Sequence, residues 1–214
     1  MIGKIRKGRS FGGCIRYVTQ KDDAKIIASE GVLLGTAEEM ARSFRWQCLL
    51  NPDVTKPVGH IALSFKPEDA PRLTDAFMAS LAEEYLELIG IRNTQFIVVR
   101  HHGTDNPHCH IVFNRVDFDG KVISDSNDFR RNEKVTKMLK DKYSLTYSEG
   151  KQSVKTEKLH ASEKVKYEIY RAVKEALRSA DTWKEFQNKL LKMGVEMEFK
   201  YKGNTNEVQG IRFI

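Results

Sequence analysis

The chain has 214 residues, a formal net charge of +7 and three cysteines, Cys14, Cys48 and Cys109. A chain of this length buries roughly 70% of its unfolded surface on folding, so it needs no disulfide bonds, and the cysteine spacing matches no zinc site. No apolar run reaches the ~20 residues of a membrane span, and the basic N-terminus lacks the apolar core of a signal peptide. We therefore expect a soluble cytoplasmic protein with reduced thiols. Its positive charge favours a polyanionic partner, most commonly nucleic acid.

The first nine residues are basic. They carry Lys4, Arg6, Lys7 and Arg9 and no acid. Such a segment predicts an arm that lies on a phosphate backbone, and these four side chains are candidate DNA contacts. The alternative interpretation is a solvated, disordered tail.

The next elements are a short helix and a strand. Residues 11–20 predict a helix entered through Gly12–Gly13, and Arg16 on it is a further candidate DNA contact. Residues 25–34 predict an apolar strand, or two short strands around Glu30–Gly31.

A capping signature and an alternating strand follow. Thr36 with Glu39 three residues later is typical of a helix N-terminus and predicts a helix over 37–49. Residues 58–65 alternate in polarity, which predicts a half-buried strand. One side of that strand carries His60, Ala62 and Ser64, and the other carries Ile61, Leu63 and Phe65.

The clearest amphipathic segment, 71–89, predicts a helix that stops at Gly90. Two strands follow it, 94–101 and 108–117, joined by the polar segment HGTDNP. Their short connection predicts an antiparallel hairpin.

The remaining elements complete the chain. They are a turn at 118–121, a helix over 128–141, a linker at 148–153, helices over 157–178 and 181–193, and a hairpin of 195–201 with 207–214. The chain ends inside this last strand pattern, so we expect more protein to follow.

Strands separated by helices, with clear hairpins, predict an α/β layered domain around one antiparallel sheet. We expect a core over residues 1–150. Residues 151–214 would form a helical appendage with a closing hairpin, packed on the same domain.

Four of the six histidines fall within ten residues: His101, His102, His108 and His110. His108 and His110 project from the same strand face, because side chains alternate along a strand. In the predicted hairpin His101 falls roughly opposite His108. The Cβ atoms of directly opposed residues are ~5 Å apart. His102 has the wrong parity. The pattern predicts that His101, His108 and His110 bind one metal ion, the alternative being ordinary surface histidines.

Three imidazoles without a fourth protein ligand leave coordination positions open, as in catalytic metal sites. Asn114 shares the strand face of His108 and His110, so it is a candidate DNA contact or a support for the ligands. Asp105, in the connection, could orient a ligand histidine or merely shape the loop.

At these residues the chain resembles a known family. RHHGTDNPHCHIVFNRVDFDGKVI resembles the metal motif of HUH-type relaxases, H-x-x-T-D-x-x-H-x-H followed by Asn, in the mobilisation nucleases of mobilisable and conjugative elements. FGGCIRYVTQK resembles the first motif of that family, VGHIALSFKPED the second, and VQGIRFI the end of such domains. The resemblance covers most of the chain.

The resemblance implies a five-stranded antiparallel sheet, with the HUH histidines on its central strands. It also implies a divalent metal, Mg²⁺ or Mn²⁺ in the cell, and single-stranded DNA nicked at an origin of transfer, with accessory mobilisation proteins as further partners. Carried over to this sequence, Tyr17 is the nucleophile and His101, His108 and His110 are the ligands. Gly103 departs from the family pattern, because many relatives have an acidic residue there. A phenol is a poor nucleophile until it is assisted, which a metal-bound phosphate would supply.

Other functions stay open at this point. A rolling-circle replication initiator shares the chemistry of a relaxase, and a non-catalytic basic DNA-binding module would need none of it. Tyr17 would then be a packing tyrosine on a short helix. A zinc hydrolase of small molecules ranks last, because the sequence has no HExxH arrangement.

Overall fold

A computed structural model describes residues 1–147 and 161–214 of the chain, in two units, Met1–Ser148 and Glu149–Ile214. The predicted linker at 148–153 and the first residues of the helix predicted from 157 lie outside the described residues.

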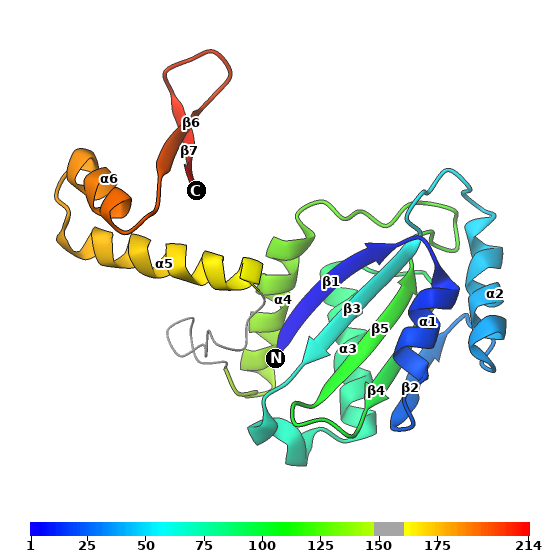
Figure 1. The fold of residues 1–214 in the computed structure, drawn as a ribbon. Helices are drawn as coiled ribbons and strands as arrows, with labels where there is room; N and C mark the ends of the chain where they lie inside the picture. Colours follow the sequence, from blue (N-terminus) through cyan, green and yellow to red (C-terminus); the bar gives the residue numbers. More distant parts are fainter. Residues whose placement is uncertain (148–160) are drawn as a thin grey trace. The chain divides into compact units, whose positions relative to one another are not determined.

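The first unit is built on one antiparallel sheet of five strands. They are β1 (Ile2–Gly8), β2 (Ala24–Glu30), β3 (Val58–Ser64), β4 (Phe96–His101) and β5 (His108–Asn114), in the order β1-β3-β5-β4-β2 (Figure 1). The predicted α/β architecture with a five-stranded antiparallel sheet is confirmed. The strand at 25–34 is a single strand ending at Glu30.

Four helices cover the sheet: α1 (Phe11–Thr19), α2 (Ala37–Cys48), α3 (Asp75–Ile89) and α4 (Asp128–Lys142) (Figure 1). Helices α1 and α2 pack on one face, and α3 and α4 pack on the other. The apolar residues buried between the sheet and α1 and α2 are Phe11, Ile15, Val18, Met40, Ala41, Phe44, Val58, Ile97, Val99 and Val112.

Strand alternation divides the side chains between the two faces. On β5, Cys109, Ile111 and Phe113 enter the core beneath α3 and α4, while Val112 enters the core beneath α1 and α2. Position 110 has the parity of Val112, so its side chain belongs to the α1 face. The central strand therefore serves both cores, and its polar side chains lie at its ends, His108 and His110 at one end and Asn114 at the other.

Helix ends follow the capping signals of the sequence. Thr36 and Glu39 form the predicted capping box, and Gly90 ends α3 in the left-handed conformation, with φ of 82°. The helix predicted over 71–89 begins later than expected. Pro67–Arg72 forms a separate 3₁₀ turn, η1, and Thr74 caps α3.

The predicted basic arm at residues 1–9 is wrong, and so is the disordered tail. These residues form the edge strand β1, which pairs with β3 along its full length, from Ile2 opposite Ser64 to Gly8 opposite Val58. Ile5 packs on the α3 core, and the parity of the strand therefore sends Lys4 and Arg6 to the other face.

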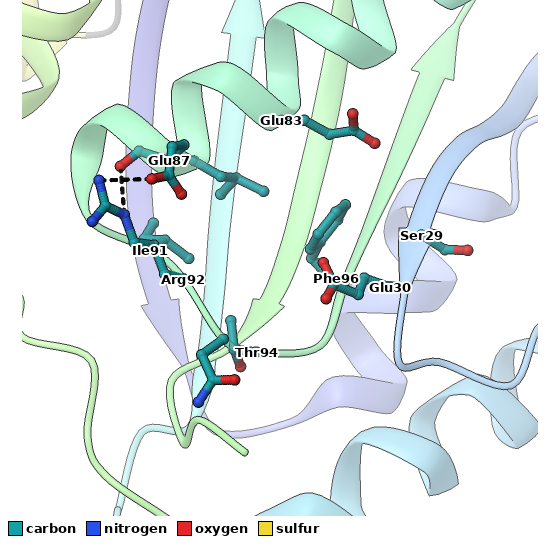
Figure 2. A pocket seen from close by; sticks show the side chains of 10 residues that line it. Ser29, Glu30, Glu83, Glu87, Ile91, Arg92, Thr94 and Phe96 are labelled. Carbon is teal, nitrogen blue, oxygen red and sulfur yellow. Dashed lines mark hydrogen bonds and ion pairs between the residues drawn. The ribbon is translucent and has the colours of Figure 1, made fainter. Parts of the chain in front are cut away.

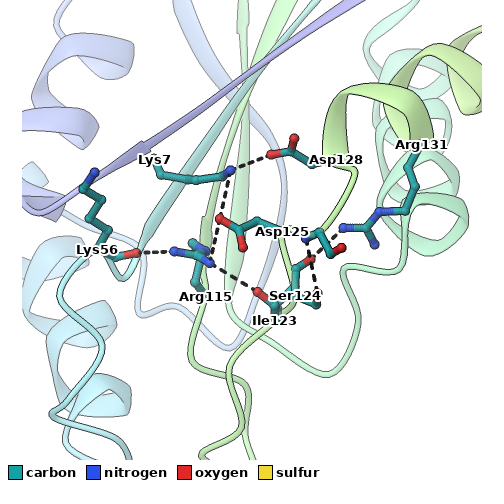
Figure 3. A network of polar contacts seen from close by, with 9 residues as sticks. Lys7, Lys56, Arg115, Ile123, Ser124, Asp125, Asp128 and Arg131 are labelled. Carbon is teal, nitrogen blue, oxygen red and sulfur yellow. Dashed lines mark hydrogen bonds and ion pairs between the residues drawn. The ribbon is translucent and has the colours of Figure 1, made fainter. Parts of the chain in front are cut away.

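Lys7, a candidate DNA contact, points with Ile5 toward α4 and is ion-paired there (Figure 3). Its ammonium lies 3.0 Å from a carboxylate oxygen of Asp125 and 2.6 Å from one of Asp128. Arg115 also reaches Asp125, at 3.3 Å. Lys7 therefore ties β1 to the start of α4 and does not serve the face on which Lys4 and Arg6 lie.

The described part of the second unit comprises two helices and a hairpin. They are α5 (Ala161–Ser179), α6 (Trp183–Lys192), β6 (Met197–Tyr201) and β7 (Val208–Phe213). The predicted hairpin is confirmed, and it forms a two-stranded sheet of its own. Its strands pack with both helices around a small apolar core that includes Ala176 and Leu190.

Within the described residues, no helix combines the length and the apolar character needed to cross a membrane.

Gly59 of β3 lies beneath the ring of Phe113, its direct partner on β5, and an added Cβ would overlap that ring. Gly59→Ala should lower the free energy of unfolding by about 1–3 kcal/mol, because overpacked cores must shift side chains or backbone. Gly8→Ala is the control, since its Cβ would meet Val58 at an ordinary 3.7 Å. Urea denaturation of both variants checks this, and equal stability of the two would contradict it.

Candidate metal centre

Three histidines meet where β4 and β5 adjoin. His101 of β4 is directly opposite His108 of β5, as the predicted hairpin requires, and His110 lies one pleat further along. One ligand atom from each of the three lies within 4.8 Å of the others. The structure thus brings together the three predicted ligands. His102 lies outside the group, exposed and 3.5 Å from a carboxylate oxygen of Asp75.

In two of these rings, one nitrogen faces a backbone carbonyl, which can only accept a hydrogen bond, so that nitrogen carries the proton. Nε2 of His101 donates to the carbonyl of Val18 at 2.8 Å, and Nδ1 of His108 lies 3.1 Å from the carbonyl of Asn106. The lone-pair nitrogens that remain, Nδ1 of His101 and Nε2 of His108, face each other at 3.1 Å. Two facing lone pairs repel unless a cation lies between them, and metal–nitrogen bonds of roughly 2.1 Å suit such a spacing.

The third ring, His110, is 6% exposed. Its pKa is lowered to about 3, mainly by burial and to a lesser extent by the neighbouring histidines His60, His101 and His108. Burial also lowers the pKa of His108. Both rings are therefore neutral at pH 7 and keep a lone pair for a metal ion, which is the form of imidazole that ligates. The residues present fit a divalent cation with open coordination positions.

Asp105 is not the residue that orients the ligands. The Nδ1 atom of His108 contacts Asn106 and the Thr104 hydroxyl instead. Gly103, which departs from the family pattern, donates its backbone N–H to Asp23, at 2.5 Å. A side chain at Gly103 would collide with that carboxylate, so Asp23 fills the space beside the histidine loop.

Tyr17 stands beside this group. Ser10 caps α1 by accepting from the Gly13 N–H, and the buried side of α1 is apolar. Tyr17 projects from the other side and is 62% exposed. Its ring centre lies 5.9 Å from that of His110. The next residue, Val18, supplies the carbonyl that holds His101, so one helix positions both the phenol and a candidate ligand.

An open hollow of about 410 Å³ joins these features. It is flanked by the two basic side chains that β1 sends to this face, Lys4 and Arg6, and no acid lines it. The residues that line it are Lys4, Arg6, Gly13, Cys14, Tyr17, His60, Ala62 and His110. A phosphate in this hollow would meet positive charge, a phenol and an imidazole.

His60 is the site residue that the sequence did not identify. It lies on β3, and its Nε2 is 3.0 Å from Nδ1 of His110. Its ring centre is 6.0 Å from that of Tyr17. The parity of His60 on its strand was visible in the sequence, but the adjacency of β3 to β5 joins segments about fifty residues apart and was not.

The other candidate DNA contacts lie elsewhere. Asn114 is fully buried and is not a DNA contact: it donates to the Phe44 carbonyl at 3.0 Å and fixes the end of β5 against α2. Arg9 is exposed between β1 and α1. Arg16 is exposed near Glu38, whose pKa is lowered by Arg45 and, more weakly, by Arg16.

A larger hollow, of about 630 Å³, lies between α3 and the edge of the sheet at β2 and β4 (Figure 2). Glu30, Glu83 and Glu87 line it, and its one arginine, Arg92, is paired with Glu87 at 2.8 Å. This acidic lining repels phosphate, so size alone does not make it the functional site. The hollow beside Tyr17 is the smaller one, but its charge and its histidines suit a polyanion.

Comparison with known proteins agrees with this geometry. A family model described as "Relaxase: MobA/VirD2-like, nuclease domain" matches residues 17–145, which is more than half of the chain. The match includes Tyr17 and all three clustered histidines. No curated protein matches the chain.

His108→Ala should abolish tight binding of Mn²⁺, because it removes one of three convergent nitrogens. The loss should exceed the ~10–100-fold that removal of an outer-sphere partner costs. The free energy of unfolding of the metal-free protein should change by less than about 1 kcal/mol, since the side chain is only partly buried. Calorimetric titration measures the binding, with His102→Ala as the control. Unchanged Mn²⁺ affinity in His108→Ala would remove His108 from the site.

Proposed function

We propose, from the premise that the chain belongs to the MobA/VirD2-like relaxase nuclease family, that it nicks single-stranded DNA at an origin of transfer through Tyr17. The proposed role is the mobilisation of a plasmid or transposon, with accessory mobilisation proteins as further partners.

One observation carries the proposal. The ring of Tyr17 stands 5.9 Å from that of His110, in a hollow flanked by Lys4 and Arg6. An in-line attack needs reacting atoms about 3–3.5 Å apart, and a phosphate between the phenol and the histidines satisfies that requirement. A packing tyrosine would not be 62% exposed. The arrangement therefore favours a nucleophile over a structural side chain.

The reaction is a transesterification. The phenol oxygen of Tyr17 forms a bond to phosphorus, and the bond from phosphorus to the 3′ oxygen breaks. The phenol loses its proton and the departing 3′ oxygen gains one, so the products are a 5′-phosphotyrosyl link and a 3′-hydroxyl. The number of phosphate ester bonds is unchanged, so the strand can be rejoined without ATP.

His101, His108 and His110 would hold a divalent cation, either Mg²⁺ or Mn²⁺ in the cell. When bound, the cation would neutralise charge on the scissile phosphate and hold it in line. The protein itself orients two of the rings through the carbonyls of Val18 and Asn106. Helix α1 holds Tyr17 at a fixed distance from them.

Lys4 and Arg6 would bind the phosphates that flank the scissile one. Both are exposed on the edge strand β1 and lie on the face that carries the histidines. Arg9, in the connection before α1, and Arg16, on α1, are exposed and would extend the path of the strand. Cleavage of an oligonucleotide library gives the nick site, which separates a relaxase from a rolling-circle replication initiator.

Tyr17→Phe should retain metal binding and DNA affinity but lose nicking and the covalent adduct together, because it removes only the phenol oxygen. The measurement is a denaturing gel of protein incubated with single-stranded oligonucleotides and Mn²⁺. Tyr143→Phe and Tyr147→Phe are matched controls, since their hydroxyls bond to Glu84 and Asp141. An adduct formed by Tyr17→Phe would assign the nucleophile to another tyrosine, and no adduct with the wild-type protein would favour a non-catalytic DNA-binding module.

Neutralising Lys4 and Arg6 together, as K4Q/R6Q, should weaken single-strand binding and reduce the slope of log affinity against log salt by about 1.4. Each phosphate contact on a single strand contributes roughly 0.7 to that slope. The charge-matched control is R130Q/K134Q, which removes two exposed cations from α4 on the opposite face of the sheet. Fluorescence anisotropy between ~50 and 200 mM salt measures both. Equal slopes for the two double variants would place the DNA elsewhere.

A further inference from the structure

His60 is a fourth histidine beside the three candidate ligands, and it contacts one of them, His110. It projects from β3 and sits diagonally across from His110: its direct partner on β5 is Val112, and Ala62 is the residue opposite His110. Diagonal neighbours on a sheet are about 7–8 Å apart, within reach of long side chains. The small side chain of Ala62 leaves room for the two rings, whose centres are 5.1 Å apart.

His110 differs from the other two candidate ligands in what holds it. The rings of His101 and His108 are held by backbone carbonyls, of Val18 and of Asn106, from segments outside the pairing of the sheet. His110 lies within the central strand, which is paired with β3 on one side and β4 on the other. The backbone carbonyls around it are used by those ladders. An acceptor for the second nitrogen of His110 must therefore be a side chain from a neighbouring strand.

We propose that His60 is a positioning residue, which accepts a hydrogen bond from Nδ1 of His110 and so directs Nε2 of His110 to the metal ion. The inference rests on the metal site of the proposed function. The contact joins Nε2 of His60 to Nδ1 of His110, at 3.0 Å, and leaves Nε2 of His110 for the cation.

The direction of this hydrogen bond follows from the chemistry of imidazole. A neutral ring carries one N–H and one lone pair. If His60 donated instead, His110 would carry its proton on Nε2 and would present an N–H, which cannot bind a cation. Acceptance by His60 is the arrangement that leaves a ligand atom on His110. Outer-sphere partners of this kind fix the tautomer and the orientation of metal-binding histidines.

The inference predicts which substitutions of His60 are tolerated. His60→Ala removes the acceptor and should weaken Mn²⁺ binding about 10–100-fold, as removal of outer-sphere partners does. His60→Gln places an amide oxygen near the position of Nε2, so it should restore most of that affinity. His102→Ala is the control, because it removes an exposed histidine from the same region without touching the group. Isothermal titration calorimetry on the full chain measures all four proteins.

A spectroscopic readout separates positioning from packing. In the wild-type protein loaded with diamagnetic Zn²⁺, nitrogen NMR should show His110 protonated at Nδ1, with a scalar coupling to Nε2 of His60 across the hydrogen bond. The coupling should be absent from His60→Ala.

The outcomes distinguish the inference from the proposed function. Failure of the wild-type protein to bind Mn²⁺ or Zn²⁺ would overturn the metal site itself. If the wild type binds and His60→Ala binds equally well, His60 does not position His110. Equal weakening in His60→Ala and His60→Gln, or a Zn²⁺-loaded wild type with no coupling between the two rings, would also overturn the acceptor role. These last two results would leave the metal site intact.

Discussion

The register in which β5 pairs with its two neighbours is the constraint on which the site depends. His101 stands opposite His108 across one ladder, and Ala62 stands opposite His110 across the other. A slip of one residue would turn the histidines of β5 into the core beneath α3 and α4 and bring Cys109 and Ile111 to the site face. The apolar residues that fix this register are therefore as necessary to the site as the ligands are.

The site combines buried histidine rings, which burial keeps uncharged, with basic side chains that are exposed to solvent. Burial lowers the pKa of His110 to about 3, so the ring is unprotonated at neutral pH and its lone pair is free to bind a metal ion. Lys4 and Arg6 remain on the rim, where water screens them from a nearby cation. With no acid lining the hollow, the charge of a bound metal would be balanced by the substrate phosphate. The arrangement suits a polyanion better than a neutral small molecule.

Strand parity and local spacing were enough to predict much of this from the sequence. They predicted the helix that carries Tyr17 and the hairpin that brings three histidines together, because both elements form between residues that are close in the chain. Contacts between distant segments were not predicted. His60 meets His110 only because β3 inserts beside β5. The first residues were misread as an arm because an edge strand with alternating Lys4, Ile5 and Arg6 has the composition of a basic tail.

The central claim is that one phosphate contacts both Tyr17 and a cation held by the three histidines. The most direct test replaces a non-bridging oxygen of the scissile phosphate with sulfur and compares nicking in Mg²⁺ and in Cd²⁺. Sulfur is a soft ligand that Mg²⁺ binds poorly and Cd²⁺ binds well. The account predicts that the sulfur-containing strand is nicked slowly in Mg²⁺ and that Cd²⁺ restores the rate. Equal slowing in both metals for each sulfur diastereomer would contradict it, because the cation would then not touch the phosphate that Tyr17 attacks.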